Sequence, residues 1–238
     1  MKLDSRNFNC IITAGTGALG NIVVGEFIKN GARVFTNYRN QEKFNTLKQS
    51  VESPEKLDGA IADLTRESDV KNFFTAACHK LNRIDIFIHL VGGFWMGGEI
   101  CETPLDRWKQ MMDMNLLSTF LATREAFSLF KSQCHGKIFT VSAKSALDLP
   151  AEMGAYAISK AGVLALTEIL AKEGKPYNIH VNSILPSIID TPANRNSMPN
   201  ADFSEWINPK DIASLLINLS KPESKALSGS ALKVYGKL

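Results

Sequence analysis

The stretch that decides the fold is Ile11-Ile12-Thr13-Ala14-Gly15-Thr16-Gly17-Ala18-Leu19-Gly20. Residues 8–13 form an apolar run typical of a buried strand, and residues 18–29 show a helical pattern that ends at Asn30-Gly31. The glycines between them fit G-x-G-x-x-G in the strand–turn–helix context that this motif requires. Glycines let the backbone approach a pyrophosphate, whose charge a helix N-terminus stabilises. The stretch therefore predicts a dinucleotide-binding turn; the alternative is a purely structural turn.

Strands and helices alternate outward from this turn to the end of the chain. The pattern predicts strands at residues 8–13, 33–38, 57–62, 84–90, 137–141, 179–185 and 231–235. It predicts helices at residues 18–29, 40–50, 67–81, 103–130 and 154–173 and one from 208, with Thr103 as the N-cap of the fourth. Continuous apolar strands between helices indicate a doubly wound parallel sheet with helices on both faces. With no linker-like segment, we expect a single α/β domain over residues 1–238.

Composition excludes several classes of protein. Of 238 residues, 45% are hydrophobic and 21% charged, and Lys plus Arg exceeds Asp plus Glu by three (27 − 24), which is typical of a globular enzyme-sized domain. Acids and bases are mixed, so we expect no nucleic-acid partner. The apolar runs are shorter than the roughly 20 residues of a membrane span. Residues 1–6 are polar and lack a signal core, which predicts a soluble, cytoplasmic protein with no membrane partner.

Cysteine and histidine spacing gives no indication of a metal site. The four cysteines and four histidines are dispersed along the chain, and no two cysteines share a CxxC spacing. We therefore expect free thiols and no bound metal.

A tyrosine and a lysine stand four residues apart in the fifth predicted helix. In Tyr156-Ala157-Ile158-Ser159-Lys160 the phenol and the amine share one helix face. A free phenol has a pKa near 10, and a nearby ammonium is expected to lower it toward neutral pH. This pair alone is a weak signal, because the spacing is common by chance.

Taken in order, these motifs resemble the short-chain dehydrogenase/reductase family along nearly the whole chain. The matching features are the turn over residues 13–20, Asp63-Leu64, Gly92-Gly93, Asn115, Tyr156-x-x-x-Lys160 and residues 186–191. The resemblance implies a single-domain Rossmann-type fold, an NAD(P) cofactor, and hydride transfer between nicotinamide and a carbonyl or alcohol. It implies that Tyr156 is the acid/base, that Lys160 tunes it and binds the nicotinamide ribose, and that Asn115 anchors a proton-relay water. The implied cofactor contacts are Gly15, Gly17, Leu19, Gly20, Asn37, Arg39, Asp63, Leu64, Gly92, Ile189 and Thr191.

The end of the second strand bears on the choice of cofactor. An acidic residue there would select NAD by binding the ribose 2′-hydroxyl. The chain instead reads Asn37-Tyr38-Arg39, and a guanidinium matches the geometry of a 2′-phosphate. We therefore expect NADP, with NAD possible. Asp63 is expected to contact the adenine edge; alternatively it caps the turn that follows it.

Several positions depart from the family pattern. Alanine replaces two of the three usual turn glycines, at Ala14 and Ala18, and His89-Leu90-Val91-Gly92 replaces N-N-A-G. The family serine aligns with Ala143, so either a one-residue insertion brings Ser142 to the substrate or the serine is absent. The segments 143–148 and 190–199 resemble the dihydropteridine reductase-like subgroup, which also has alanine at the serine position. These departures leave open a second interpretation, a cofactor-binding sensor or scaffold with degraded catalysis.

Two further expectations concern surfaces. Residues 104–130 and 154–173 carry more apolar side chains than one sheet face can cover, and the family pairs the equivalent helices across a two-fold axis, so a homodimer or homotetramer is expected. Residues 187–207 form a long irregular connection after the sixth strand, with apolar Met198, Phe203 and Trp206. We expect a substrate lid there; the alternative is a flap fixed to the body.

Overall fold

The computed structural model describes residues 8–238, and it confirms the parallel sheet. Residues 1–6, whose polar character was noted above, lie outside the described part. The strand order is β3-β2-β1-β4-β5-β6-β7, and every pairing is parallel. The strand bounds are β1 (Asn9–Ile12), β2 (Arg33–Tyr38), β3 (Leu57–Ile61), β4 (Ile86–Ile88), β5 (Gly136–Val141), β6 (Ile179–Pro186) and β7 (Ala231–Val234). The order reverses between β1 and β4, the point where open α/β sheets bind ligands.

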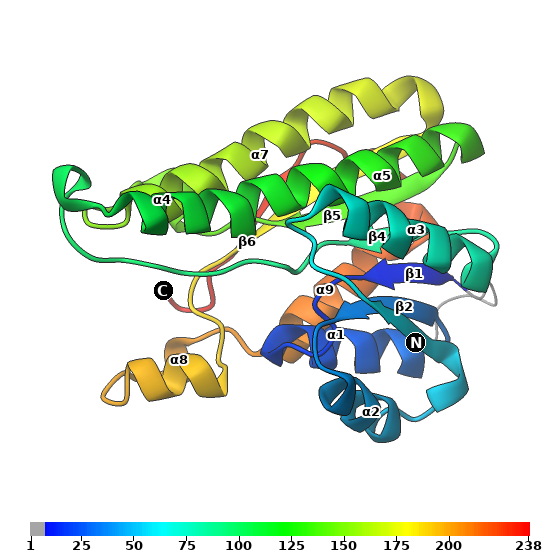
Figure 1. The fold of residues 1–238 in the computed structure, drawn as a ribbon, viewed down its shortest axis with the longest axis horizontal. Coiled ribbons are helices and arrows are strands. Elements are labelled where there is room, and N and C mark those ends of the chain that lie inside the picture. The colour runs from blue at the N-terminus through cyan, green and yellow to red at the C-terminus, as the bar shows by residue number, and fades with distance from the viewer. Residues whose placement is uncertain (1–7) are drawn as a thin grey trace.

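Helices cover both faces of the sheet (Figure 1). One face is packed by α1 (Ala18–Lys29), α2 (Gln41–Ser50) and α9 (Pro209–Ser220). The other is packed by α3 (Glu67–Leu81), α5 (Ser118–Gln133) and α7 (Gly154–Gly174). Shorter helices are α4 (Leu105–Met111), α6 (Ser145–Asp148) and α8 (Pro192–Ser197), with 3₁₀ turns at Pro54–Lys56, Ile100–Glu102, Lys175–Tyr177, Phe203–Glu205 and Pro222–Ala226.

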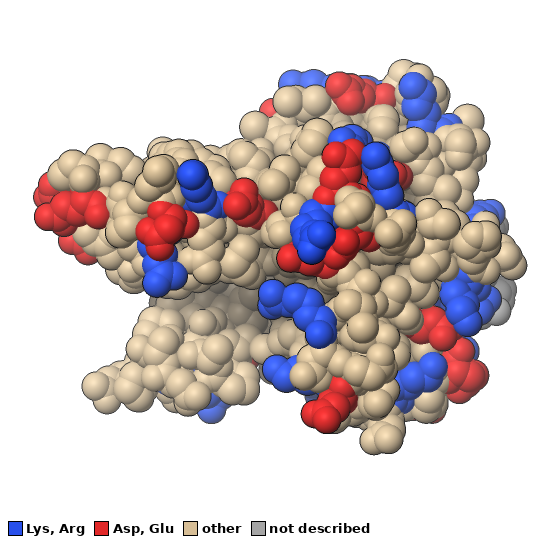
Figure 2. Space-filling model, viewed as in Figure 1, with Lys and Arg blue, Asp and Glu red and all other residues tan. Residues whose placement is uncertain are grey.

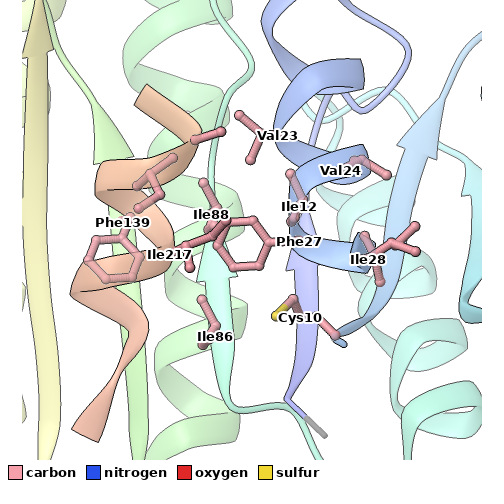
Figure 3. Packing of buried hydrophobic residues seen from close by; sticks show 14 of the residues in the cluster. Cys10, Ile12, Val23, Val24, Phe27, Ile28, Ile86, Ile88, Phe139 and Ile217 are labelled. Carbon is pink, nitrogen blue, oxygen red and sulfur yellow. The ribbon is translucent and has the colours of Figure 1, made fainter. Parts of the chain in front are cut away.

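The core beside the switch point consists of buried apolar side chains. Figure 3 shows Phe27 of α1 beside Ile12 of β1, Ile88 of β4 and Ile217 of α9. Phe27, Ile12 and Ile88 are fully buried. Burying one such side chain contributes about 1.5–3 kcal/mol, so these contacts hold the β1–α1 turn on a rigid base. Cys10 lies in the same cluster as a free cysteine, and burial raises the pKa of its thiol.

The long helix predicted over residues 103–130 is built differently from the expectation. The helix begins at Leu105, with Pro104 as its N-cap residue and no side-chain cap, so the prediction of a Thr103 cap is wrong. The Thr103 hydroxyl instead donates to the carbonyl of Glu99, 3.3 Å away, and closes the preceding turn. Between α4 and α5 the chain forms a π-helical segment, Met112–Leu117. Such segments insert an extra residue into a helix and occur frequently at functional sites.

One helix of the described residues is long and apolar enough to cross a bilayer by length and composition. It comprises α7 and the turn after it, Gly154–Tyr177, with a mean hydropathy of 1.3 in its most apolar window, 44% of which is buried. The sequence analysis expected no such stretch. The apolar side chains of α7 are explained by packing, because the helix lies on the sheet beside α5 and contributes Leu170 and Ala171 to the core.

Candidate active site

The tyrosine and lysine of α7 lie at the carboxyl end of the sheet. Lys160 is only 5% exposed, and its ammonium donates to the carbonyl of Val141, 2.9 Å away at the end of β5. Burial lowers the pKa of Lys160 to about 8 and raises the pKa of Tyr156 to about 12. The pKa of Tyr156 is therefore raised by desolvation of the phenol and not lowered by Lys160, as the sequence had led us to expect.

Asn115 links the end of β4 to α7. It lies in the π-helical segment and is fully buried. Its Oδ1 accepts from the Gly93 amide at 2.9 Å, while Nδ2 donates to the Gly93 carbonyl at 3.1 Å and to Ser159 Oγ at 3.0 Å. The Ser159 hydroxyl in turn donates to the Tyr156 carbonyl at 2.7 Å. Three segments that are far apart in sequence are thus joined around one carboxamide.

Gly92 lies where these groups converge. A β-carbon at this position would lie 2.9 Å from Asn115 Oδ1 and 3.1 Å from Lys160 Nζ. The structure thus brings Gly92, Asn115 and Lys160 together, three of the residues that the sequence singled out. Ser159 was not among them, although a hydroxyl between the tyrosine and the lysine was a visible signal.

Two side chains of β2 accept hydrogen bonds from amides of the glycine turn. The amide of Ala14 donates to Asn37 Oδ1 at 2.8 Å, and the amide of Gly15 donates to Thr36 Oγ1 at 3.0 Å. A β-carbon on Gly15 would lie 2.3 Å from that hydroxyl, and one on Gly20 would lie 2.0 Å from the Ala14 carbonyl. The turn therefore needs glycine at both positions. Leu19 is half-buried against the core.

The N-terminus of α1 carries no side-chain cap. Its N-cap residue is Gly17, which has no side chain to bond the first amides of the helix. The first amide groups of any helix lack partners within the helix, and they attract anions. The glycine cradle and the uncapped helix end together fit a pyrophosphate group.

The polar residues at the end of β2 and after β3 have clear local partners. The carboxamide of Asn37 is 6% exposed and also donates to the Ala62 carbonyl at 3.1 Å, so it braces the turn. Asp63 Oδ1 accepts from the amide and hydroxyl of Thr65 at 3.0 and 2.8 Å. These bonds lower the Asp63 pKa, with a smaller effect from the Arg39 charge. Asp63 therefore caps its turn, as the alternative in the sequence analysis had it, and Leu64 is buried beneath it.

Arg39 is an exposed cation that directly follows β2. It has no ion pair within 4 Å among residues 8–238, although its charge acts on Asp63. The guanidinium is therefore available for an anion at the end of β2.

Ser142 is turned into the protein. Its hydroxyl is 1% exposed and donates to the Lys160 carbonyl at 2.8 Å, which supports α7. The next residue, Ala143, is 6% exposed and has no polar side chain. Ser145 Oγ, two residues further on, is buried and has no hydrogen-bond partner within the described part of the chain. The structure does not place a serine hydroxyl of this segment in contact with Tyr156.

His89 forms a buried connection that the sequence analysis did not assign. The Ser118 hydroxyl donates to the Met114 carbonyl at 2.6 Å, so it accepts from Nε2–H of His89 at 3.3 Å. Nδ1 then accepts from the Thr13 hydroxyl, also at 3.3 Å. Burial lowers the His89 pKa to about 3, so the ring is neutral at physiological pH. It ties the start of the glycine turn to the helix that carries Asn115.

The segment after β6 is partly anchored. Ile189 pairs with Ile207 in a parallel bridge, and Thr191 Oγ1 accepts from the Asn194 amide at 3.2 Å as the N-cap of α8. Trp206 is 8% exposed and packs on Phe203 with ring centroids 4.7 Å apart. Both ends of residues 187–207 are attached to the body, because Ser187 donates to the carbonyls of Val234 and Tyr235 and Ile207 belongs to the buried core cluster. Closure of the part between them over a ligand stays a prediction.

Comparison with known proteins agrees with this geometry. The short chain dehydrogenase family pattern matches residues 9–202. The chain is 25% identical to 3-oxoacyl-(acyl-carrier-protein) reductase FabG of Thermotoga maritima, over 96% of both chains. It is also 25% identical to an uncharacterized oxidoreductase of Bacillus subtilis, YxjF, over 95% of this chain and 96% of that one.

Solved structures share the fold along the whole chain. A short chain dehydrogenase from Bacillus anthracis is 26% identical with a TM-score of 0.86, over 96% of this chain and 95% of that one. ElxO, solved with NADP bound, is 24% identical with a TM-score of 0.90, over 97% and 98%. With the family pattern matched over residues 9–202 and the parallel sheet and glycine turn in place, this chain belongs to the short-chain dehydrogenase family of oxidoreductases.

Proposed function

We propose that this protein is an NADPH-dependent reductase of carbonyl compounds in which Tyr156 supplies the proton. One observation carries the proposal: the side chains of Lys160 and Asn115 converge on Gly92 at the ligand-binding edge of the sheet. Lys160 lies one helical turn from Tyr156 in α7. Bound NADPH would supply the hydride. The cradle of Gly15, Gly17 and Gly20 would hold its pyrophosphate on the N-terminus of α1, since β-carbons at two of these positions would clash with their neighbours.

Tyr156 is in the protonation state that reduction needs. With a pKa of about 12, the phenol is protonated at neutral pH and donates to an oxygen that gains negative charge as hydride reaches the carbon. The reverse reaction needs a phenolate, which burial disfavours. Lys160 would bind the nicotinamide ribose, and Asn115 would hold a relay water. Burial therefore keeps Tyr156 in the protonated form that a proton donor in reduction needs near neutral pH.

The cofactor proposal rests on Arg39 and on relatives. An exposed guanidinium without an ion pair at the end of β2 suits a 2′-phosphate. ElxO, which shares the fold, has been solved with NADP bound. Ile189 and Thr191 would lie against the nicotinamide carboxamide. We propose NADP as the preferred cofactor, with NAD accepted more weakly.

NADPH oxidation over a panel of ketones, aldehydes and a quinonoid dihydropterin tests the proposal. The dihydropterin is included because residues 143–148 and 190–199 resemble the dihydropteridine reductase-like subgroup. We expect NADPH binding and turnover of at least one carbonyl. Tight NADPH binding without turnover of any member would favour the sensor or scaffold instead. This alternative is favoured by the hydroxyl of Ser142, which bonds to the Lys160 carbonyl.

We further propose that the protein self-associates through α5 and α7. Their outer faces expose Phe120 (42%), Ile158 (44%) and Ile169 (51%), and water contact with such side chains is unfavourable. A two-fold axis would bury the same patch on both copies. Light scattering at micromolar concentration should give a dimer or tetramer, and a monomer would contradict this proposal.

A further inference from the structure

Exposed apolar side chains gather beside Tyr156. The ring of Phe94, in the loop after β4, meets the Tyr156 ring edge-on at 77° with centroids 5.0 Å apart. Phe94 is nevertheless 59% exposed, Met96 48% and Leu149 61%. Leu149 belongs to the connection between α6 and α7, which the Gly97 amide joins to the loop by donating to the Glu152 carbonyl at 3.0 Å. The two segments form one apolar wall next to the phenol.

The charges on this wall are negative. Residues 90–104 contain Glu99 and Glu102 and no lysine or arginine, and the connection adds Glu152. None of these three carboxylates has an ion pair within 4 Å among residues 8–238. Figure 2 shows a hollow between the lobe that carries α4 and the lobe that carries α8, with acidic residues at the tip of the first lobe.

Two cations of neighbouring segments, Arg195 and Lys144, have carboxylate partners within the chain. Arg195 of α8 donates to both carboxylate oxygens of Asp190, at 2.6 and 2.7 Å, and its guanidinium lies 4.7 Å from the centre of the Phe203 ring. Lys144 lies 3.8 Å from the carboxylate of Asp148. An anionic group on a substrate that reached residues 94–104 would thus meet the unpaired carboxylates of Glu99 and Glu102.

Building on the proposed reductase function, we propose that the substrate is an uncharged carbonyl compound with an aromatic or extended apolar body, and that carboxylated and phosphorylated carbonyls are discriminated against. Such a body would cover Phe94, Met96 and Leu149, and removing their apolar surface from water is favourable. The Phe94 ring would meet it edge-on or stacked, in the arrangements that aromatic pairs prefer. A carboxylate on the same body would be repelled by Glu99 and Glu102 without compensation.

Two aryl ketones that differ in one carboxylate test the inference on the whole protein. We would measure kcat/KM with NADPH, and separately the binding of each ketone to the protein loaded with NADP⁺, which does not depend on turnover. We expect the neutral ketone to be favoured at least about tenfold in both measurements. Equal values for the two ketones, or a preference for the carboxylate, would overturn the substrate class and leave the reductase function standing.

Variants separate the wall from general effects. Phe94→Ala should lower kcat/KM for the neutral aryl ketone by about tenfold, the value of one good aromatic contact. Leu227→Ala, an exposed apolar side chain outside both the wall and the α5/α7 surface, is the control and should change it less than twofold. The double variant Glu99→Gln, Glu102→Gln should raise kcat/KM for the carboxylated ketone severalfold while changing the neutral one little. An unchanged ratio between the two ketones would contradict the role of these carboxylates.

The binding measurement tests the substrate class separately from the reductase function. A neutral-ketone preference in binding without any turnover would support the substrate class and contradict the reductase function. The absence of both binding and turnover with every aryl ketone would overturn the substrate class. Turnover of small aliphatic carbonyls alone would keep the reductase function and exclude the aromatic body.

Discussion

The two sides of the candidate site are built in opposite ways. On the catalytic side, Lys160, Asn115 and Ser159 are buried, and each bonds to a neighbouring segment. On the substrate side, Phe94 and Leu149 are largely exposed, and Glu99 has no ion pair among the described residues. In the proposed function, the groups for chemistry are therefore held in place by buried hydrogen bonds, whereas the groups for substrate specificity lie on loops, which tolerate change.

The largest effect is expected from the buried charge on the catalytic side. Lys160→Met keeps the length of the side chain and removes the ammonium, so turnover should fall at least about 100-fold and NADPH affinity about tenfold or more. Steady-state kinetics and NADPH fluorescence titration measure the two losses. Unchanged NADPH affinity would remove Lys160 from the cofactor site.

Lys160→Met should also change how the free energy of unfolding depends on pH. The Lys160 pKa is about 8 in the folded protein and near 10.4 when unfolded, so the unfolded chain holds more protons between these values. Burying the charged form costs stability at and below pH 8, and this cost, about 3 kcal/mol, disappears as the pH rises toward 10.5. Lys160→Met should therefore show a smaller rise in unfolding free energy over this range than the wild type, by urea denaturation. An identical rise in both proteins would contradict the burial of the charge.

A smaller effect is expected at the exposed corner of the cofactor site. Arg39→Ala should weaken NADPH binding about tenfold and NADH binding little, because one charge-assisted bond contributes roughly 1.5–3 kcal/mol. Arg66→Ala is the matched control, since Arg66 also acts on the charge of Asp63. An equal loss of affinity for NADPH and NADH would show that Arg39 does not bind the 2′-phosphate.

The smallest effect is expected at the turn itself. Ala14 has a φ of 54°, in the left-handed region where a β-carbon is unfavourable. Ala14→Gly should raise the free energy of unfolding by about 0.5–1 kcal/mol, since strain in the folded state outweighs the extra freedom of the unfolded chain. Thermal denaturation measures the change. A loss of stability would show that the turn holds alanine without strain.

Elements that are defined by their own local residue pattern could be predicted from the sequence. The glycine turn, helix α1 over residues 18–29 and strand β2 over residues 33–38 appear with the predicted bounds, because apolar periodicity and Gly31 define them locally. The helix predicted from residue 208 is confirmed as α9, with Asn208 as its N-cap, for the same reason.

Features that depend on distant partners were not predictable from the sequence. The position of Thr103 looked like a cap, but its hydroxyl bonds to the preceding turn. Spacing left two alternatives for Ser142, and only the position of the Lys160 carbonyl shows that its hydroxyl supports α7. Burial keeps His89 neutral, and the hydroxyls of Thr13 and Ser118 that bond its ring come from segments far apart in the sequence, which no local pattern reveals.

Tyr156→Phe tests the central claim most directly, with turnover of a neutral aryl ketone and NADPH affinity measured on the same preparation. The variant removes the hydroxyl and keeps the ring against Phe94. We predict that kcat falls 10²–10⁴-fold, as loss of a general acid does, while NADPH affinity stays within about twofold of the wild type. Wild-type kcat in the variant would contradict the account of Tyr156 as the proton donor.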